Sequence, residues 1–333
     1  MNRLRIAVVG LGKMGLLHTS LLNIFPAVEL VAICEKSTLM TRLFKKLFSK
    51  SGVRVVNDLE KLQGLELDAV YVTTPITSHS YIIKEVYGKN IARNIFVEKT
   101  LAFDYRQSRE LCKIAKNVGG LAMVGYMKRF SVTFRKAKNI LEQCVLGEIS
   151  SFDAYAFSSD FSKIQSDSKK SATRGGVLSD LGSHVIDLAL WFFGDFEVEA
   201  ASAKSILNEV SEDSVDFTVK KLGLEGVVHT SWCMDNYRMP NFGLAITGSS
   251  GIMKVNDYSV DLKLNNGESH RWFKHNLDDH VNFLLGESEY YREDEAFVKS
   301  LLNGSGVEPS FVTASKVDKV IDQVKKKAKV NGT

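Results

Sequence analysis

The stretch that decides the fold runs from Ile6 to Gly15 and reads IAVVGLGKMG. Its first four residues are continuously apolar, which is typical of a strand buried on both faces of a parallel sheet. The next six have the spacing G-x-G-x-x-G: Gly10, Leu11, Gly12, Lys13, Met14 and Gly15. A helical pattern follows, and a strand, a glycine loop and a helix in this order predict a dinucleotide-binding site.

Each glycine of this loop has an expected physical role. Gly10 permits a tight turn, Gly12 lets the backbone approach a pyrophosphate, and Gly15 allows the helix to pack closely on the strand. The pyrophosphate is expected on the free N–H groups at the start of the helix. Taken alone, the pattern also fits a glycine-rich turn that binds nothing.

Glu35 supports the dinucleotide interpretation. It lies twenty positions after Gly15, at the end of the second predicted strand, where a carboxylate accepts hydrogen bonds from the adenosine ribose. A carboxylate repels a 2′-phosphate, so NAD is favoured over NADP. Lys36 offsets part of that repulsion, and NADP stays open as the alternative. An ordinary exposed acid is the competing interpretation of Glu35.

The first third of the chain alternates between two kinds of segment. Short apolar runs recur at residues 6–9, 30–33, 69–72, 94–97 and 121–124, and helical periodicity covers 14–25, 38–48, 78–88 and 104–117. Such repetition predicts right-handed crossovers and a doubly wound parallel sheet. We therefore expect a Rossmann-type α/β domain over residues 1–124.

Residues 125–333 have a different pattern. Alternating runs occur at 149–157, 215–221, 226–233, 243–247 and 252–264, and helical segments at 131–144, 180–193, 290–303 and 312–329. Alternation of apolar and polar residues is typical of strands with one solvated face. This half is expected to be an α+β domain with a large open, mainly antiparallel sheet.

Polar residues follow two further strands of the first domain. Ligands of open α/β sheets bind beyond the carboxyl ends of the strands. The residues placed there are Thr73, Thr74, Pro75 and, at the start of the next helix, His79; and Glu98, Lys99 and Thr100. Lys99 is the chief chemical candidate, and a solvated loop lysine is the alternative.

A second polar group lies on a predicted helix of the other half. Asp180, His184 and Asp187 are spaced four and three apart, so they share one helical face. The residues between them are mostly apolar, and polar groups on a buried helix need partners or a cavity. Aspartate with histidine makes a general acid–base pair. A satisfied core histidine with a capping aspartate is the alternative.

Composition excludes several classes of protein. The 333 residues are 44% hydrophobic and 25% charged, which suits two folded domains and rules out disorder. A net charge of +4 does not favour nucleic acid. Four scattered cysteines predict free thiols and no metal site. Without an apolar stretch long enough for a bilayer or a signal-peptide pattern, we expect a soluble, cytoplasmic protein with no membrane partner.

Together these features resemble the glucose–fructose oxidoreductase/inositol dehydrogenase (Gfo/Idh/MocA) family. The family's T-P-x-x-x-H, E-K-P and G-G-G-x-x-x-D-x-G-x-H-x-x-D segments are similar to residues 74–79, 98–100 and 174–187. Residues 126–129 look like the segment after the sixth strand of inositol dehydrogenases. Thr100 departs from the family's proline, which removes a constraint on the Lys99 loop. Arg174 departs from its first glycine.

The resemblance implies an NAD(P)-dependent dehydrogenase that acts on a secondary alcohol carbon of a sugar, a sugar derivative such as a nucleotide sugar, or a cyclitol. It places Lys99, Asp180 and His184 around the reacting hydroxyl. A lysine has an ordinary pKa of ~10.4 and a histidine ~6.5, so we expect His184 to accept the proton. Lys99 would then polarise the oxygen and Asp180 would orient both. The reverse assignment of Lys99 and His184 stays open.

Partners are also implied by the resemblance. Tyr126, Arg129 and Arg174 are expected to bind substrate, and Arg174 favours an anionic one, although a surface ion pair explains it equally. A homodimer or homotetramer through the outer face of the second sheet is expected. Two other functions on the same fold compete: a non-catalytic NAD(P)-binding regulator or sensor, and a reductase of an imine or linear tetrapyrrole. An intact acid–base set argues against the regulator.

Overall fold

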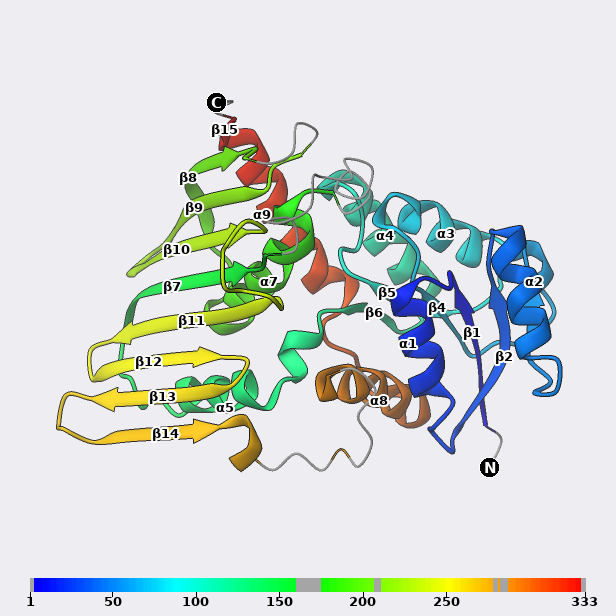
Figure 1. Ribbon diagram of the computed structural model, residues 1–333, viewed down its shortest axis with the longest axis horizontal. Coiled ribbons are helices and arrows are strands. Elements are labelled where there is room, and N and C mark those ends of the chain that lie inside the picture. Colours follow the sequence, from blue (N-terminus) through cyan, green and yellow to red (C-terminus); the bar gives the residue numbers. More distant parts are fainter. Residues whose placement is uncertain (1–2, 160–174, 207–210, 278–280, 282–286, 331–333) are drawn as a thin grey trace. The chain divides into compact units, whose positions relative to one another are not determined.

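The computed structural model describes residues 3–159, 175–206, 211–277, 281 and 287–330. The chain forms two compact units (Figure 1). Unit 1 comprises Met1–Tyr126 and Val281–Ser315, and unit 2 comprises Met127–His280 and Lys316–Thr333. Within the described residues, no helix has the length and apolarity needed to cross a bilayer.

Unit 1 contains a parallel sheet, as the sequence predicts. Its six described strands are β1 (Leu4–Val9), β2 (Val28–Cys34), β3 (Arg54–Val56), β4 (Ala69–Val72), β5 (Asn94–Glu98) and β6 (Ala122–Gly125). They run in the order β3-β2-β1-β4-β5-β6, with every neighbouring pair parallel. The doubly wound fold is confirmed. The strand order reverses between β1 and β4, and such sheets bind ligands at this switch point.

Helices cover this sheet and explain its continuously apolar strands. They are α1 (Lys13–Leu22), α2 (Thr38–Leu47), α3 (Ile76–Gly88), α4 (Tyr105–Val118) and α8 (Ser288–Asn303), with a 3₁₀ turn, η1 (Leu59–Leu62). Local signals set their ends: Ser37 and Asp104 accept from backbone N–H groups at the starts of α2 and α4, and Gly119 ends α4 in the left-handed region.

The placement of residues 281–315 differs from the single boundary expected after residue 124. The first boundary falls after Tyr126, close to the expected one, but α8 returns to unit 1 after the strands of unit 2. The reason is side-chain chemistry: Asp294 of α8 is fully buried and bonds to His18 of α1. Helical periodicity shows which face of a helix is buried, and not which sheet receives it.

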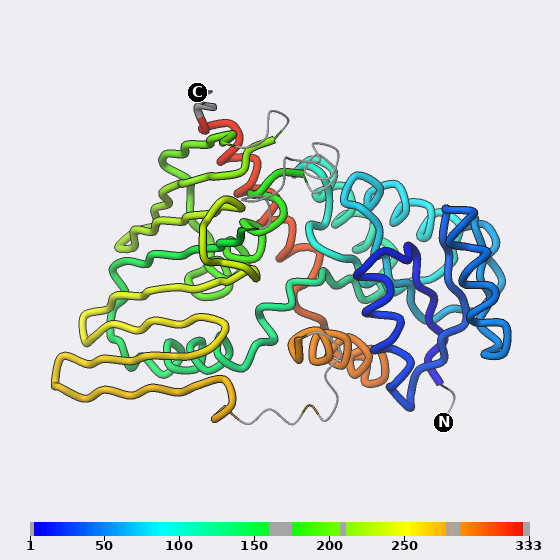
Figure 2. The backbone as a smooth tube through the Cα atoms, viewed as in Figure 1, coloured from blue at the N-terminus to red at the C-terminus, as the bar shows by residue number. Residues whose placement is uncertain are grey.

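Unit 2 contains the large mixed sheet. Its nine described strands are β7 (Ile149–Phe157), β8 (Glu197–Lys204), β9 (Ser214–Lys221), β10 (Leu224–Ser231), β11 (Asn241–Gly248), β12 (Gly251–Asn256), β13 (Ser259–Leu264), β14 (Ser269–Phe273) and β15 (Lys329–Val330). Their order is β14-β13-β12-β11-β7-β10-β9-β8-β15. Only β7–β10 and β15–β8 pair in parallel among these strands. The mainly antiparallel sheet is confirmed, and its hairpins β11 to β14 can be followed in Figure 2.

The single run expected at 252–264 is two strands. Asn256 explains the break, because its side-chain oxygen accepts from the N–H groups of Tyr258 and Ser259 and closes a tight turn. The remaining helical elements are η2 (Met127–Phe130), α5 (Val132–Glu142), a π-helical turn η3 (Leu178–Gly182), α7 (Ser183–Phe193), η4 (Lys274–Asn276) and α9 (Phe311–Lys327).

One face of this sheet packs on helices. Along β7, Phe152, Ala154 and Ala156 are buried and alternate with more exposed residues. Phe152 stacks on Phe193 at the end of α7, with 4.4 Å between ring centroids. The core of unit 2 therefore lies between the sheet and its helices, as the period-two pattern predicts.

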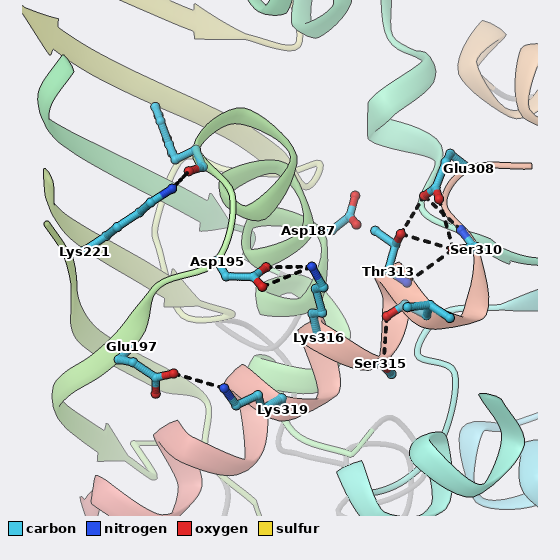
Figure 3. Close-up of polar contacts among 12 residues, drawn as sticks. Asp187, Asp195, Glu197, Lys221, Glu308, Ser310, Thr313, Ser315, Lys316 and Lys319 are labelled. Atoms are coloured by element: carbon cyan, nitrogen blue, oxygen red, sulfur yellow. Dashed lines mark hydrogen bonds and ion pairs between the residues drawn. The ribbon is translucent and has the colours of Figure 1, made fainter. Parts of the chain in front are cut away.

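Helix α9 is held by polar contacts that Figure 3 displays. In unit 1, the N–H of Thr313 donates to the hydroxyl of Ser310, which caps the helix. In unit 2, Lys316 pairs with Asp195 at 2.9 Å and Lys319 with Glu197 at 3.0 Å. The latter pairs are exposed, so their effect on stability is small.

Two residues that come shortly after β6 in the sequence form buried ion pairs. Lys128 lies 2.7 Å from Asp257. The guanidinium of Arg129 donates two hydrogen bonds, of 2.6 and 2.7 Å, to the carboxylate of Asp187 on α7. All four side chains are buried. Buried charges cost desolvation energy, so removing one partner is far more harmful than removing an exposed pair.

We predict that Arg129→Ala destabilises the protein by about 3–5 kcal/mol, because Asp187 loses its bidentate partner in a dry site. Lys319→Ala, which removes an exposed pair, should cost less than about 1 kcal/mol. Urea unfolding of both variants measures the two values. Equal losses would contradict the structural role of the Arg129–Asp187 pair.

Candidate functional site

The turn between β1 and α1 is built by close packing. Gly10 has φ of 94°, in the left-handed region that favours glycine. A Cβ atom on Gly15 would lie 2.0 Å from the carbonyl oxygen of Gly10, so no side chain fits there. Both geometries agree with the roles that the glycine spacing predicts. They bring the first turn of α1 against the end of β1.

Gly12 differs from these two glycines. It is the N-cap of α1, and a Cβ atom there would meet nothing within 4 Å. The packing of the chain therefore does not require a glycine at this position. Open space at a helix N-terminus, where backbone N–H groups attract anions, fits a bound pyrophosphate.

Glu35 borders the same loop at the end of β2. Its Oε2 accepts from the N–H of Leu11 and its Oε1 from the N–H of Ser37, both at 2.8 Å. A carboxylate offers about four acceptor positions, so two ribose hydroxyls can still be bound. Lys36 beside it is exposed. The residues present thus fit a dinucleotide.

The loop after β4 is tied to the glycine loop. The hydroxyl of Thr73 donates to the carbonyl of Gly10 at 2.8 Å, and Thr74 accepts a hydrogen bond from Ser78. Pro75 is the N-cap of α3. These contacts place the ends of β1 and β4 side by side at the switch point.

His79 lies behind this loop and is fully buried. Its Nδ1 lies 2.8 Å from the carbonyl of Thr100, and its Nε2 lies 2.8 Å from that of Thr74. Burial lowers the pKa of His79. Both ring nitrogens are thus engaged with backbone, and the residue joins the loops after β4 and β5.

Lys99 directly follows β5, as expected. The Lys99–Thr100 peptide is cis, and Thr100 is buried. Glu98 is also buried; its Oε2 accepts from the N–H of Lys99 at 3.2 Å, and its Oε1 lies 2.9 Å from Nε2 of His18. His18 was not among the residues expected from the sequence. Its signal is modest: a polar residue three positions after Gly15, on the sheet-facing side of α1.

The predicted acid–base residues Asp180 and His184 lie in unit 2. Asp180 lies in the π-helical turn η3, and His184 in the first turn of α7. His184 is buried, and its ring lies at 75° to that of Phe242, with 5.4 Å between centroids. The apolar pattern predicts one continuous α-helix over 180–193, and the π-helical turn departs from it. π-Helical turns often occur at functional sites because they reorient side chains.

The three expected substrate residues have different settings. Tyr126, at the end of β6, is fully buried, and the guanidinium of Arg129 is bonded to Asp187. Arg174 lies outside the described residues. Gly175 and Gly176, which follow it, both have positive φ values. Among the described residues, no group of three or more His, Cys, Asp or Glu is arranged to hold a metal ion.

Comparisons with known proteins agree with this geometry. Residues 4–126 match the model of an oxidoreductase family with an NAD-binding Rossmann fold, and residues 134–254 match the GFO/IDH/MocA C-terminal domain. The chain therefore belongs to the Gfo/Idh/MocA family of NAD(P)-dependent oxidoreductases, and the resemblance seen in its motifs is confirmed.

Its relatives include several dehydrogenases. The inositol 2-dehydrogenase of Rhizobium meliloti is 22% identical over 92% of this chain and 91% of its own length. The myo-inositol 2-dehydrogenase of Thermotoga maritima is 23% identical over 90% of this chain and 89% of its own length.

Solved structures share the fold. A levoglucosan dehydrogenase in complex with NADH and levoglucosan has a TM-score of 0.84 at 18% identity, covering 98% of this chain and 97% of its own. A 3-ketoreductase from Actinomadura kijaniata, in complex with TDP-benzene and NADP, has a TM-score of 0.79 at 20% sequence identity. The match covers 100% of each chain.

Gly12→Ala and Gly15→Ala should separate binding from folding. We expect Gly12→Ala to change the free energy of unfolding by about 0.5 kcal/mol or less, because its Cβ enters open space, yet to weaken NADH binding at least ~10-fold. Gly15→Ala should destabilise unit 1 itself, because its Cβ meets a backbone oxygen. NADH fluorescence titration and thermal unfolding measure both effects. Normal NADH affinity in Gly12→Ala would contradict the proposed pyrophosphate position.

Proposed function

We propose that the protein transfers a hydride between the nicotinamide of NAD(P) and a secondary alcohol or ketone carbon of a sugar, a sugar derivative or a cyclitol. One observation carries this proposal: Lys99 follows β5 of one unit, and in the other unit Asp180 of η3 and the buried His184 of α7 are four residues apart. Relatives named as inositol dehydrogenases support the substrate class.

The acid–base work is assigned to three side chains. An alcohol carbon releases hydride only as its hydroxyl loses a proton, so a base must touch that oxygen. His184 accepts this proton, Lys99 donates a hydrogen bond to the reacting oxygen, and Asp180 orients the other two. The C–H bond then breaks with its electron pair, and a C=O bond forms.

The cofactor supplies the redox chemistry: when bound, the nicotinamide ring accepts the hydride in oxidation and returns it in reduction. The chain holds its other end through Gly12 and Glu35, as the open helix N-terminus and the anchored carboxylate support. His184 is shielded from water by its burial beside Phe242, which strengthens hydrogen bonds at the reacting oxygen.

We also propose that the protein forms a homodimer or homotetramer through the face of the second sheet that carries Val227 and His229. These side chains alternate with the buried residues of β10 and are partly exposed in the single chain. Such a face suits a symmetric interface, and sedimentation of the purified protein measures the oligomeric state.

Turnover of sugars and cyclitols tests the reaction. With NAD and then NADP, across cyclitols, free sugars and nucleotide sugars, we expect at least one panel member to be oxidised. Lys99→Ala and His184→Ala should each lower kcat by about 10²–10⁴-fold. His275→Ala, which removes an exposed histidine of η4, is the control and should keep full activity.

The pH profile then assigns the base. If His184 accepts the proton, the residual activity of Lys99→Ala keeps the acidic limb of the pH profile, and that of His184→Ala loses it. The opposite result would exchange the two roles. Tight cofactor binding without turnover of any panel member would contradict the proposed reaction and favour a regulator.

Glu35→Ser should change the choice of cofactor. Removing the carboxylate is expected to lower kcat/KM with NAD by about 10-fold and to leave kcat/KM with NADP unchanged or raised, because repulsion of a 2′-phosphate is lost. Glu29→Gln, near the start of the same strand and paired with Arg5, is the matched control. An unaltered NAD/NADP ratio in Glu35→Ser would refute the ribose contact.

A further inference from the structure

A chain of buried polar groups runs through unit 1 to the predicted catalytic lysine. Asp294 of α8 lies 2.8 Å from Nδ1 of His18 on α1, and Nε2 of His18 lies 2.9 Å from Glu98. Glu98 in turn accepts from the N–H of Lys99. His18 and Asp294 are fully buried and Glu98 nearly so. Three elements distant in sequence are thus joined at one histidine.

The partners of His18 define its charge state. Both ring nitrogens face carboxylates, and an imidazole donates from both only when it is protonated. Burial alone would lower the pKa of His18, but the charges and hydrogen bonds of Asp294 and Glu98 outweigh it and raise the pKa well above its usual range. Burial also raises the pKa of Asp294. The other titratable groups nearby are Tyr71 of β4 and, on α8, Tyr290 and Glu293.

Rings hold the imidazole in place. His18 packs against Phe96 of β5 and Tyr71 of β4, with ring centroids 5.0 and 5.7 Å away. The ring of Tyr290 lies nearly perpendicular to it at 6.3 Å. A ring so enclosed has little freedom to rotate. Glu98, bonded to that ring, is therefore held rigidly at the end of β5.

The location of this network gives it a role beyond stability. A buried ion network is often no more stabilising than apolar side chains of the same size. This network starts at Asp294 of α8 and passes through His18 of α1, the helix whose N-terminus is the candidate pyrophosphate site. It ends at the backbone of Lys99. Fixed geometry between cofactor and acid–base groups is what hydride transfer requires.

We propose that His18, anchored by Asp294, is a positioning residue for Lys99: it holds the Glu98 carboxylate that fixes the Lys99 backbone relative to α1. The inference rests on the proposed function of Lys99 at the reacting oxygen. It extends the site to α8, which the motifs of the chain do not include.

Kinetics of three variants test the positioning. His18→Gln should lower kcat by roughly 10- to 100-fold, the scale of a 1 Å misplacement, and Asp294→Asn by a smaller factor. NADH affinity should change less than about threefold in both, because Gly12 and Glu35 are untouched. Thr19→Ala is the control: Thr19 is the next residue of α1, buried, with no hydrogen-bond partner for its hydroxyl among the described residues.

The outcomes are distinct. A fall in melting temperature with normal kcat, measured well below that temperature, would show a structural role only and overturn the inference. If Lys99→Ala keeps full turnover, the proposed function fails. If Lys99→Ala is inactive while His18→Gln and Asp294→Asn are normal, the positioning alone fails.

Crystal structures of the wild type and His18→Gln with NADH give a readout that does not need turnover. We expect the Glu98–Lys99 segment to move by about 1 Å in the variant while the glycine loop stays in place. An unmoved Lys99 would refute the inference.

The pH dependence of stability is a second such readout. A raised folded pKa means that His18 stabilises the protein fully below pH ~6.5 and progressively less as pH rises through the folded value. The difference in melting temperature between wild type and His18→Gln should therefore shrink from pH 6.5 toward pH 10. A difference that grows with pH would show a neutral ring and contradict the ionic bridge.

Discussion

The rest of unit 1 depends on the close approach of α1 to the ends of β1 and β4. Gly15 allows this approach, because any side chain there would collide with the carbonyl of Gly10. The hydroxyl of Thr73 stabilises the contact by donating a hydrogen bond to the same carbonyl oxygen. The approach sets where the helix N-terminus opens and where His18, one turn further along, enters the core. The candidate pyrophosphate site and the setting of Lys99 thus share one steric origin.

Both units bury charge, and they do so next to the predicted chemistry. In unit 1 the imidazole of His18 lies between two carboxylates. In unit 2 Arg129 is hydrogen-bonded to Asp187, which lies one helical turn after His184. Such arrangements cost desolvation energy and tolerate little movement. The benefit is a fixed backbone beside Lys99 and a fixed α7, which suits a reaction that needs exact placement more than flexibility.

Several predictions from the sequence were confirmed for a local reason. Continuous apolar runs became the parallel strands, and alternating runs became the second sheet. The short strand β3, the strand β8 and the edge strands β14 and β15 were missed. Strands of two or three residues, or strands with mixed polarity, leave too little pattern to separate from loops.

The sequence by itself determined the fold class, the glycine turn and the positions of Lys99 and His184 on their elements, because each depends on neighbours a few residues away. Tertiary structure alone decided that α8 belongs with the nucleotide-binding sheet, that Arg129 is engaged by Asp187, and that His18, Glu98 and Asp294 meet. Those contacts join residues 58 to 276 positions apart. No local pattern encodes which of many buried polar groups will pair, since that choice is made by how the packed elements exclude water.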